Sequence, residues 1–294
     1  MKAAFLRCLI LLVLAHTTLH AQFRFRDLDE KSLELLDGDA PVFVYNRGMI
    51  LKEGVRQDRA RCCYLSPVYA PNGVVITDDF PREELHHRGI FWAWPVVKVD
   101  GQAYDLWRLT GIHARPVRLL SKRADKDKAI LGVENRWFVG DRAVVQERVE
   151  IVAHPARSGQ RDLDFTIRLR ALVNGIEIAG EPEQHKGYGG LGIRFARRKT
   201  TVLRTQDNED APDSDSIPAP WAQLTGNFEG KEAGARITID PANPGFPNPW
   251  CFRHYGFLGV NYPGLAGVRL SKAKALVLKY RITLLAGAPP TATP

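Results

Sequence analysis

The sequence predicts an all-β protein, built as one large antiparallel β-sandwich with few short helices. Two long segments alternate apolar and polar residues with a period of two, "RDLDFTIRLRALV" at 161–173 and "KALVLKYRITLL" at 274–285. Such alternation is typical of strands with one face in a core and the other in water. The chain is also punctuated by 25 glycines and 19 prolines, and helical periodicity is scarce. A sandwich satisfies all three observations.

The first 21 residues predict a secretory signal peptide. Lys2 and Arg7 give a positive start, an apolar run covers 9–15, and His20-Ala21 forms a small-residue cleavage point. The apolar run is too short to span a bilayer. No later segment has 18 unbroken apolar residues. We therefore expect an exported chain that starts near Gln22, resides in the periplasm or outside the cell, and has no membrane partner.

The remaining chain predicts a single domain over 22–288. Turn signals such as Asn72-Gly73 and Asn174-Gly175 separate its strands. No blade-length repeat is present, which argues against a propeller, and 289–294 is expected to be a disordered tail. Besides the two long segments, strands are predicted at 41–45, 62–69, 73–77, 90–97, 129–139, 143–153, 235–239 and 256–261.

The charge and the cysteines limit the classes of partner. The formal net charge of +8 would fall to +6 on loss of the signal peptide, and it suits acidic glycans. The basic residues are scattered and export is expected, so nucleic acid is not a predicted partner. Cys62, Cys63 and Cys251 would remain in the exported chain. They leave two alternatives open, a disulfide from the Cys62–Cys63 pair to Cys251 or three buried thiols. No C-x2-C spacing indicates structural zinc.

The segment "EELHHRGIFWAWP" at 83–95 concentrates chemistry at a loop-to-strand junction. His86 and His87 are natural proton donors or acceptors near neutral pH. Neighbouring side chains on a strand point to opposite faces, so both histidines are expected in one site only where the chain is irregular. Trp92 and Trp94 would share one strand face, as a platform for a sugar ring or as core residues. The Glu-x-x-His spacing of di-iron bundles is present, but the helices which that site requires are not predicted.

Three further junctions bring similar side chains. Glu183 with His185 could act as an acid–base pair, and Tyr188 and Arg194 follow it. No helix follows the glycines of this segment, so they form no phosphate cradle. The other two junctions contain Trp107, Arg108 and His113, and Trp250, Arg253, His254 and Tyr255. Because buried cores exclude such groups unless they are paired, we expect the four junctions to converge on a polar, aromatic-lined cleft of the kind that holds carbohydrate.

Other signals are weaker or absent. The acidic segment 205–221 is expected to be a surface loop that borders the cleft, since its spacing matches no calcium-binding loop. No nucleophile elbow, P-loop, dinucleotide fingerprint or H-E-x-x-H motif occurs. Serine hydrolase, nucleotide-dependent and zincin chemistries are therefore not predicted. No cofactor is expected, although a divalent metal is left open.

Four motifs together resemble a family of uncharacterised exported bacterial proteins that carry the label "methane oxygenase PmoA". The motifs are "PVFVYNRG", "TDDFPREELHHRGIFWAWPVV", "HKGYGGLGIRF" and "NPWCFRHYGFLGVNYPG". The label does not suit this chain, because a particulate methane monooxygenase subunit crosses the membrane several times. The resemblance, over about 35–285, implies a supersandwich similar to galactose mutarotases. His87, Gly89 and Trp92 resemble a mutarotase histidine segment, whereas the C-terminal glutamate of mutarotases has no match.

The main hypothesis is an exported carbohydrate-active enzyme. It would be a glycoside hydrolase or a lyase that acts at a glycosidic or anomeric carbon of a native or oxidised sugar. The expected acid–base residues are His86, His87, Glu183 and His185. Substrate binding is expected from Arg88, Trp92, Trp107, Tyr188, Arg194, Arg253 and His254.

Two alternatives belong to other classes. The first is a non-catalytic glycan-binding module, in which the aromatic residues matter and the histidines do not. The second is a metal-assisted lyase that uses several of His86, His87, His113, His185 and His254. The oligomeric state is left open.

Overall fold

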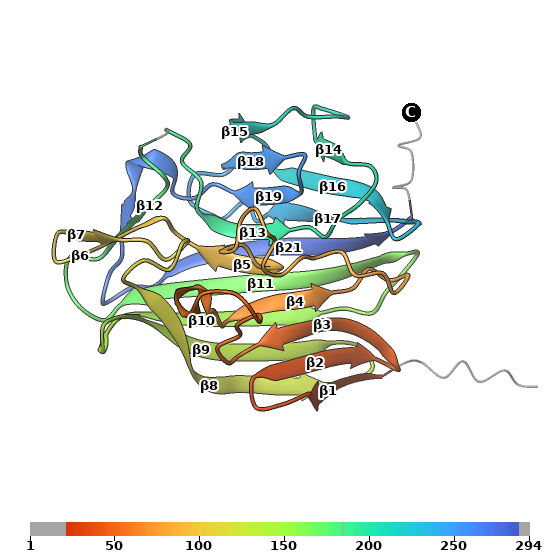
Figure 1. Ribbon diagram of the computed structural model, residues 1–294, viewed down its shortest axis with the longest axis horizontal. Helices are drawn as coiled ribbons and strands as arrows, with labels where there is room; N and C mark the ends of the chain where they lie inside the picture. The colour runs from red at the N-terminus through yellow and green to blue at the C-terminus, as the bar shows by residue number, and fades with distance from the viewer. Residues whose placement is uncertain (1–21, 184, 288–294) are drawn as a thin grey trace, which may run out of the picture.

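The computed structural model describes residues 22–183 and 185–287, and it confirms the predicted all-β sandwich (Figure 1). These residues form 21 strands and two single-turn 3₁₀ helices, η1 (Gln57–Arg59) and η2 (Gly264–Ala266). All pairings between strands are antiparallel. The predicted signal peptide at 1–21 and the predicted tail at 289–294 lie outside the described residues. Within them, no helix has the length and apolar character needed to cross a membrane.

The front layer in Figure 1 is a nine-stranded sheet. Its strands, in spatial order, are β1 (Phe23–Asp27), β2 (Ser32–Asp37), β3 (Ala40–Asn46), β4 (Tyr64–Val68), β5 (Ile90–Ala93), β13 (Gly190–Arg194), β19 (Phe257–Val260), β18 (Pro249–Arg253) and β15 (Ser214–Pro218).

An eight-stranded sheet lies behind it, and a small four-stranded sheet closes one end. The order in the eight-stranded sheet is β14 (Val202–Thr205), β16 (Trp221–Phe228), β17 (Lys231–Ile239), β21 (Leu276–Ala286), β11 (Gln160–Ala171), β10 (Arg142–Ala153), β9 (Ala129–Val139) and β8 (His113–Ala124). The small sheet contains β20 (Val268–Arg269), β12 (Glu177–Ala179), β6 (Val96–Val99) and β7 (Gln102–Tyr104).

The two long alternating segments form strands β11 and β21, as their period of two predicted. β11 and β21 pair with each other over ten residues, from Gln160↔Leu285 to Leu169↔Leu276. The predicted strand at 73–77 is wrong, because only the isolated bridges Tyr69↔Val75 and Thr77↔Phe195 form there. The predicted strand at 90–97 is divided into β5 and β6 at Trp94-Pro95, where the proline cannot donate a ladder hydrogen bond.

The core lies between the two large sheets and contains both tryptophans of the 83–95 segment. Trp92 packs against Phe165 of β11, with ring centres 6.4 Å apart, and Trp94 packs against Trp137 of β9 at 5.4 Å. Trp92 therefore faces the eight-stranded sheet. Trp94, two residues further along, faces the same way, because side chains alternate along an extended chain. Of the two alternatives, the core position is the one observed, and a platform for a sugar at Trp92 is not supported.

Candidate functional site

A hollow on the outer face of the nine-stranded sheet lies over three small residues on neighbouring strands, Gly192, Gly259 and Cys251. Gly192 of β13 pairs with Phe91 of β5 on one side and with Gly259 of β19 on the other. Gly259 pairs in turn with Cys251 of β18. A Cβ atom added at Gly192 or Gly259 would lie 2.7 Å from the ring of Phe257. The two glycines therefore provide the space in which this ring rests against the sheet and forms a floor.

The segment 78–89 covers one side of this floor and is fixed by Arg88. The Arg88 side chain is 0% exposed, and its Nε lies 3.4 Å from an oxygen of Asp79. Its guanidinium donates to the carbonyls of Leu85 and His87 at 2.8 and 2.7 Å. It also lies 3.5 Å from the ring centre of Phe80. A buried guanidinium with these partners holds the segment in shape, so its position does not support the predicted contact with a substrate.

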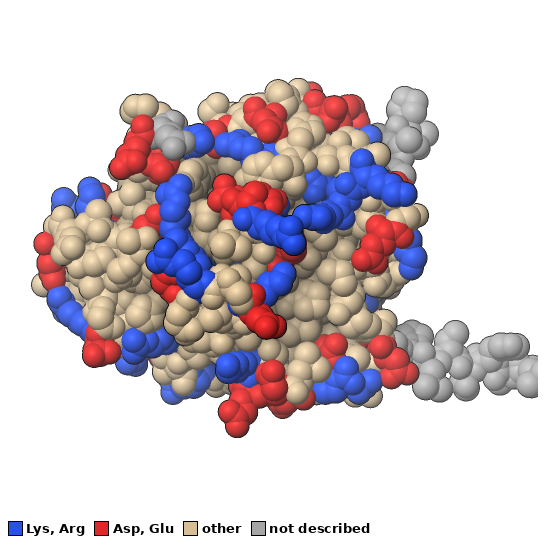
Figure 2. All heavy atoms as spheres, in the orientation of Figure 1, with Lys and Arg blue, Asp and Glu red and all other residues tan. Residues whose placement is uncertain are grey.

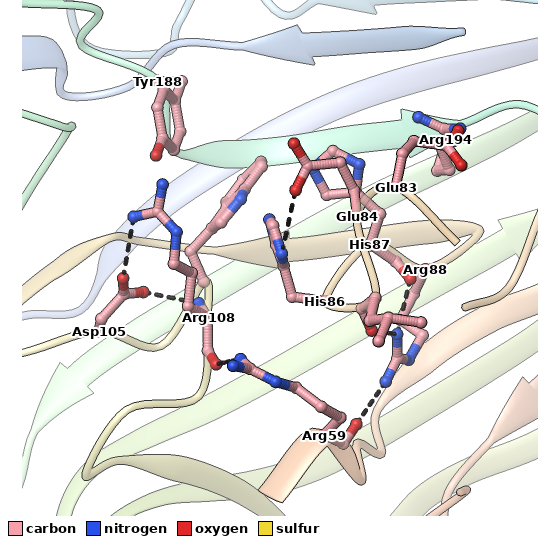
Figure 3. Close-up of polar contacts among 12 residues, drawn as sticks. Arg59, Glu83, Glu84, His86, His87, Arg88, Asp105, Arg108, Tyr188 and Arg194 are labelled. Atoms are coloured by element: carbon pink, nitrogen blue, oxygen red, sulfur yellow. Dashed lines mark hydrogen bonds and ion pairs between the residues drawn. The ribbon is translucent and has the colours of Figure 1, made fainter. Parts of the chain in front are cut away.

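His86 and His87 line one cavity above the floor (Figure 3). Their ring centres lie 4.5 Å apart with the planes at 71°. The sequence argument placed both in one site only where the chain is irregular, and residues 81–88 form turns rather than a strand. The His87 ring also stacks on Phe257, with ring centres 4.9 Å apart. The irregular backbone thus brings both imidazoles to the same site.

Trp107 forms the opposite wall. Its ring centre lies 5.7 Å from that of His87 and 5.1 Å from that of Tyr188. Arg61 supports this wall from below, because its Nη2 donates to the Trp107 carbonyl at 2.9 Å and also to the Leu106 carbonyl. Two of the predicted binding residues, Trp107 and Tyr188, are therefore in contact with each other at the cavity.

Arg108 stands between two carboxylates at the same wall, and Figure 3 shows the one of Asp105. Its Nη1 lies 3.4 Å from Asp105 Oδ2 and 3.8 Å from Glu181 Oε2. Burial alone would lower the pKa of Arg108, but Tyr188 and the two carboxylates raise it overall. Glu181 is buried and adjoins the Tyr188 hydroxyl at 3.4 Å. Of Glu181 and Glu183, Glu181 is thus the residue whose carboxylate lies close to the cavity.

The predicted pair Glu183 and His185 does not reach the cavity. Both residues are exposed and neither lines it. Glu183 instead donates its backbone N–H to Glu181 Oε1 at 2.8 Å. The acid–base role predicted for these two residues is therefore not supported by where they lie.

The third side of the cavity comes from β18 and the turn that follows it. Arg253 lines the cavity, and its Nη2 donates to both carboxylate oxygens of Asp215 at 2.6 and 2.7 Å. His254 points elsewhere, with Nδ1 2.7 Å from an oxygen of Asp213. The acidic segment at 205–221 is thus more than a surface loop, because it contains β15 and supplies the carboxylates that contact Arg253 and His254. Of the two predicted residues, Arg253 belongs to the cavity and His254 does not.

Arg194 lies beneath the cavity rather than in its lining. Its side chain is 3% exposed, and its guanidinium forms an ion pair with Glu83 (Figure 3). It also lies 4.8 Å from the ring centre of Tyr255. Because Glu83 belongs to the segment that carries both histidines, this ion pair attaches that segment to the sheet. Its burial and its absence from the cavity lining do not support the predicted contact of Arg194 with a substrate.

The walls enclose a cavity of about 190 Å³ that opens to solvent. Figure 2 shows basic and acidic side chains side by side across the middle of this face. Aromatic rings and paired charges offer apolar surface together with hydrogen-bond donors and acceptors, a composition suited to a small polar ligand. The cavity is lined by Glu84, His86, His87, Trp107, Arg108, Lys186, Tyr188, Cys251, Arg253, Tyr255 and Phe257.

The pKa values of both imidazoles in the cavity lie below the ordinary value of histidine. Burial and the positive charges of Arg61, Arg108, Arg59 and Arg88 lower the pKa of His86 to about 3. Burial and the neighbouring His86 place the pKa of His87 well below its ordinary 6.5. Glu84 lines the cavity beside them, with Oε2 3.4 Å from His86 Nδ1. His86 therefore has a carboxylate at one ring nitrogen, which orients the imidazole, while its lowered pKa keeps the ring uncharged at neutral pH and makes it a weak proton acceptor.

Sequence reasoning missed several residues of this cavity. Glu84 lay within the motif but was considered only for metal spacing, and Glu181, which lies just behind the cavity wall, was not singled out. Phe257 and Cys251 gave no signal that separated them from core residues. The glycines within β13 and β19 were a usable signal, because a glycine inside a strand indicates a close approach of another group.

The described residues contain no group of three His, Cys, Asp or Glu side chains placed to hold a metal ion. His113 does not line the cavity that holds His86 and His87. It lines a smaller cavity with Cys62, Cys63 and Glu147, while His185 and His254 lie outside both. The five histidines named for a metal-assisted lyase are therefore not brought together.

The fold and the cavity define an all-β sandwich protein with a small polar site on the outer face of one sheet. The chain belongs to a family of unknown function (DUF6807), whose model matches residues 32–293. No curated protein matches the chain.

Proposed function

We propose that this protein is a carbohydrate-active enzyme and that the cavity holds one sugar unit of its substrate. The observation that carries the proposal is the position of His86, whose Nδ1 lies 3.4 Å from Glu84 Oε2 in a cavity with aromatic walls. Trp107, Tyr188 and Phe257 offer apolar surface for the face of a sugar ring. The paired charges around Arg108 and Arg253 match hydroxyl groups, which both donate and accept hydrogen bonds.

In this mechanism His86 removes a proton from the substrate or from a water molecule. With Nδ1 toward Glu84, the other ring nitrogen of His86 accepts the proton, and the Glu84 carboxylate stabilises the imidazolium that forms. Arg108 lies on the opposite wall and would stabilise negative charge that develops on a substrate oxygen. The reaction site on the sugar is the glycosidic or anomeric carbon, or a carbon next to it.

The composition of the lining favours elimination over the usual form of hydrolysis. Most glycosidases place two carboxyl groups on either side of the scissile bond. Among the described residues that line the cavity, Glu84 is the one carboxylate. A single base beside stabilising cations instead suits removal of a proton next to a carbonyl, so an oxidised sugar is the favoured substrate. Hydrolysis of a native glycoside is the second candidate, because Glu181 lies close behind the wall.

The experiment is a screen of the exported chain against native and oxidised oligosaccharides, with products identified by mass spectrometry. His86→Gln is expected to reduce turnover of an active substrate by about 10²- to 10⁴-fold, the usual contribution of a general base, while binding persists. The matched control is His185→Gln, an exposed histidine outside the cavity, which is expected to leave turnover unchanged. Saturable binding without turnover would instead identify a glycan-binding module, and full turnover by His86→Gln would overturn the assigned base.

Export is part of the same proposal. The signal peptide predicted at 1–21 places the enzyme in the periplasm or outside the cell, where polymeric glycans are accessible. N-terminal sequencing of the protein recovered from a secreting bacterial host is expected to start near Gln22. Recovery of the uncleaved chain inside the cell would contradict the predicted location without affecting the assignment of the cavity.

A further inference from the structure

Two neighbouring thiols meet in the interior, outside the lining of the candidate site. Side chains of adjacent residues in an extended chain point in opposite directions, yet the Sγ atoms of Cys62 and Cys63 lie 3.1 Å apart. The cause is the backbone of Cys63, whose φ of 65° is left-handed. This conformation is unfavourable for a non-glycine residue and persists where the surroundings impose it. Here the Cys63 N–H is held by the Asn46 carbonyl at 2.6 Å.

The pair is enclosed and has no competing cysteine beside it. Cys62 and Cys63 are 3% and 6% exposed, and they line a cavity of about 20 Å³ with Glu147. Cys251 instead lines the candidate site on the outer face of the nine-stranded sheet. The disulfide from this pair to Cys251, one of the two sequence alternatives, is therefore not formed, and all three cysteines are free and buried.

From this geometry we propose that Cys62 and Cys63 form a disulfide with each other when the chain folds in the presence of a disulfide oxidant such as oxidised glutathione. The thiolate of one cysteine attacks the oxidant and expels one molecule of thiol. The thiolate of the other then attacks the mixed disulfide and expels the second. The two protons lost by the cysteines end on the two expelled glutathione thiolates and the two electrons go to the oxidant, so each bridge formed converts one molecule of oxidised glutathione to two thiols.

The step belongs to folding rather than to the finished structure. Burial raises the pKa of the Cys63 thiol well above its ordinary value, so the reactive thiolate is scarce in the folded protein. In the unfolded chain both thiols are accessible, and the left-handed Cys63 then brings them together as β4 forms. Adjacent Cα atoms lie about 3.8 Å apart, closer than the usual spacing across a disulfide, so the bridge is easily reduced wherever a reductant reaches it. Burial shields it in the native state.

The pair also adjoins the support of the candidate site. Arg61 precedes Cys62 in the chain and donates to the Trp107 carbonyl in the cavity wall. A covalent bridge at 62–63 would restrain the backbone from which this arginine extends. The proposal itself does not depend on the activity of the cavity, because the bridge is detected by mass.

The test is a peptide analysis of the full chain, refolded with a mixture of reduced and oxidised glutathione and then denatured and alkylated without reductant. Trypsin cleaves after Arg61 and Arg82, so one peptide contains both cysteines, while Cys251 falls in another. The 62–82 peptide is expected to be unalkylated and lighter than the dithiol by two hydrogen atoms, and Cys251 is expected to be fully alkylated. In the native protein the bridge is expected to survive reduced glutathione that removes it from the denatured protein.

Three results would overturn the proposal. They are alkylation of both Cys62 and Cys63 without prior reduction, a glutathione adduct on either residue, and a cross-linked peptide that joins one of them to Cys251. The same analysis on protein recovered from an exporting host provides a second measurement that needs no refolding. Cys63→Ser is the matched control, since its 62–82 peptide cannot form an internal bridge and Cys62 must be recovered either alkylated or as the glutathione adduct.

Discussion

The central strands of the two large sheets are buried in different ways. β5, β13 and β19 of the nine-stranded sheet are buried at every residue. β11 of the eight-stranded sheet instead alternates between buried positions and positions that are partly or fully exposed. The difference arises because segments such as 78–89 cover the outer face of the nine-stranded sheet, while the outer face of β11 meets solvent. The outer face of the nine-stranded sheet is thus a covered face, and on this covered face the fold can enclose a site.

The two regions also bury different kinds of side chain. β11 buries Leu163, Phe165, Ile167 and Leu169 against the core. The covered face buries Arg61, His87, Arg88, Glu181 and Arg194. Burial of charged and polar groups is costly unless they are paired, so the covered face gains less stability per buried residue than the alternating strands. We therefore expect substitutions in β11 to affect folding and substitutions at the covered face to affect binding, and four predictions test this division.

The largest loss of stability is expected from Ile167→Ala in β11. Ile167 is 0% exposed, and removal of three of its carbons leaves a cavity in the core. The free energy of unfolding should fall by about 2–5 kcal/mol, measured by urea denaturation, while the affinity of the folded variant for a sugar ligand stays unchanged. Thr166→Ala, on the opposite face of the same strand, is the control. A loss of affinity at full folding would show that the two regions are not separable.

A smaller loss of stability, joined to a loss of binding, is expected from Gly259→Ala. The added Cβ would lie 2.7 Å from the Phe257 ring, which must then move into the cavity. Overpacking of this kind costs about 1–3 kcal/mol, and the ring would occupy the ligand's space. Gly132→Ala in β9 is the control, because its Cβ would meet Ser121 at 3.2 Å, away from the cavity. Calorimetric titration that finds unchanged affinity in Gly259→Ala would remove Phe257 from the floor of the site.

The same division explains what the sequence could predict. Period-two alternation identified β11 and β21, because each residue of such a strand reports the face on which it lies. The junctions were also found, since His86, Trp107, Tyr188 and Arg253 all line the cavity. In a loop, however, the direction in which each side chain points follows no period. Contacts with distant segments decide it, and this is why Glu84 lines the cavity and Glu183 does not.

Arg88 shows a second limit of the sequence. An arginine beside two histidines resembles a ligand contact, but the carbonyls of Leu85 and His87 receive its donors. Those carbonyls become available only after 78–89 has folded into turns. No local pattern indicates whether a guanidinium binds a substrate or holds its own loop, so this distinction required the structure.

The pH dependence of stability is the third prediction, with a slope of up to about 1.4 kcal/mol per pH unit. Burial and neighbouring arginines lower the pKa of His86 from 6.5 to about 3. Between these values the unfolded chain binds a proton that the folded chain excludes, so acidification in this window favours unfolding, and above it this effect vanishes. The slope should be smaller in His86→Gln, measured by urea denaturation at several pH values. It should not vanish, because His87 contributes in the same direction. An equal slope in wild type and variant would mean that His86 is protonated in the folded protein.

The smallest effect is expected from Asp164→Asn on the open face of β11. Asp164 accepts hydrogen bonds from Arg281 at 2.7 and 3.0 Å and contacts His154 at 2.8 Å. Solvent reaches all three side chains, and exposed ion pairs contribute about 0–1 kcal/mol.

The matched change on the covered face is Glu83→Gln, which also removes a carboxylate from an arginine. Its partner Arg194 is buried and would remain there as a charge without its counterion, which is costly. Although Asp164 has more partners than Glu83, Glu83→Gln should therefore destabilise the protein more, as measured by urea denaturation of both variants. A larger loss in Asp164→Asn would show that burial of the partner does not decide the strength of these ion pairs. The contrast between the two sheet faces would then rest on packing alone.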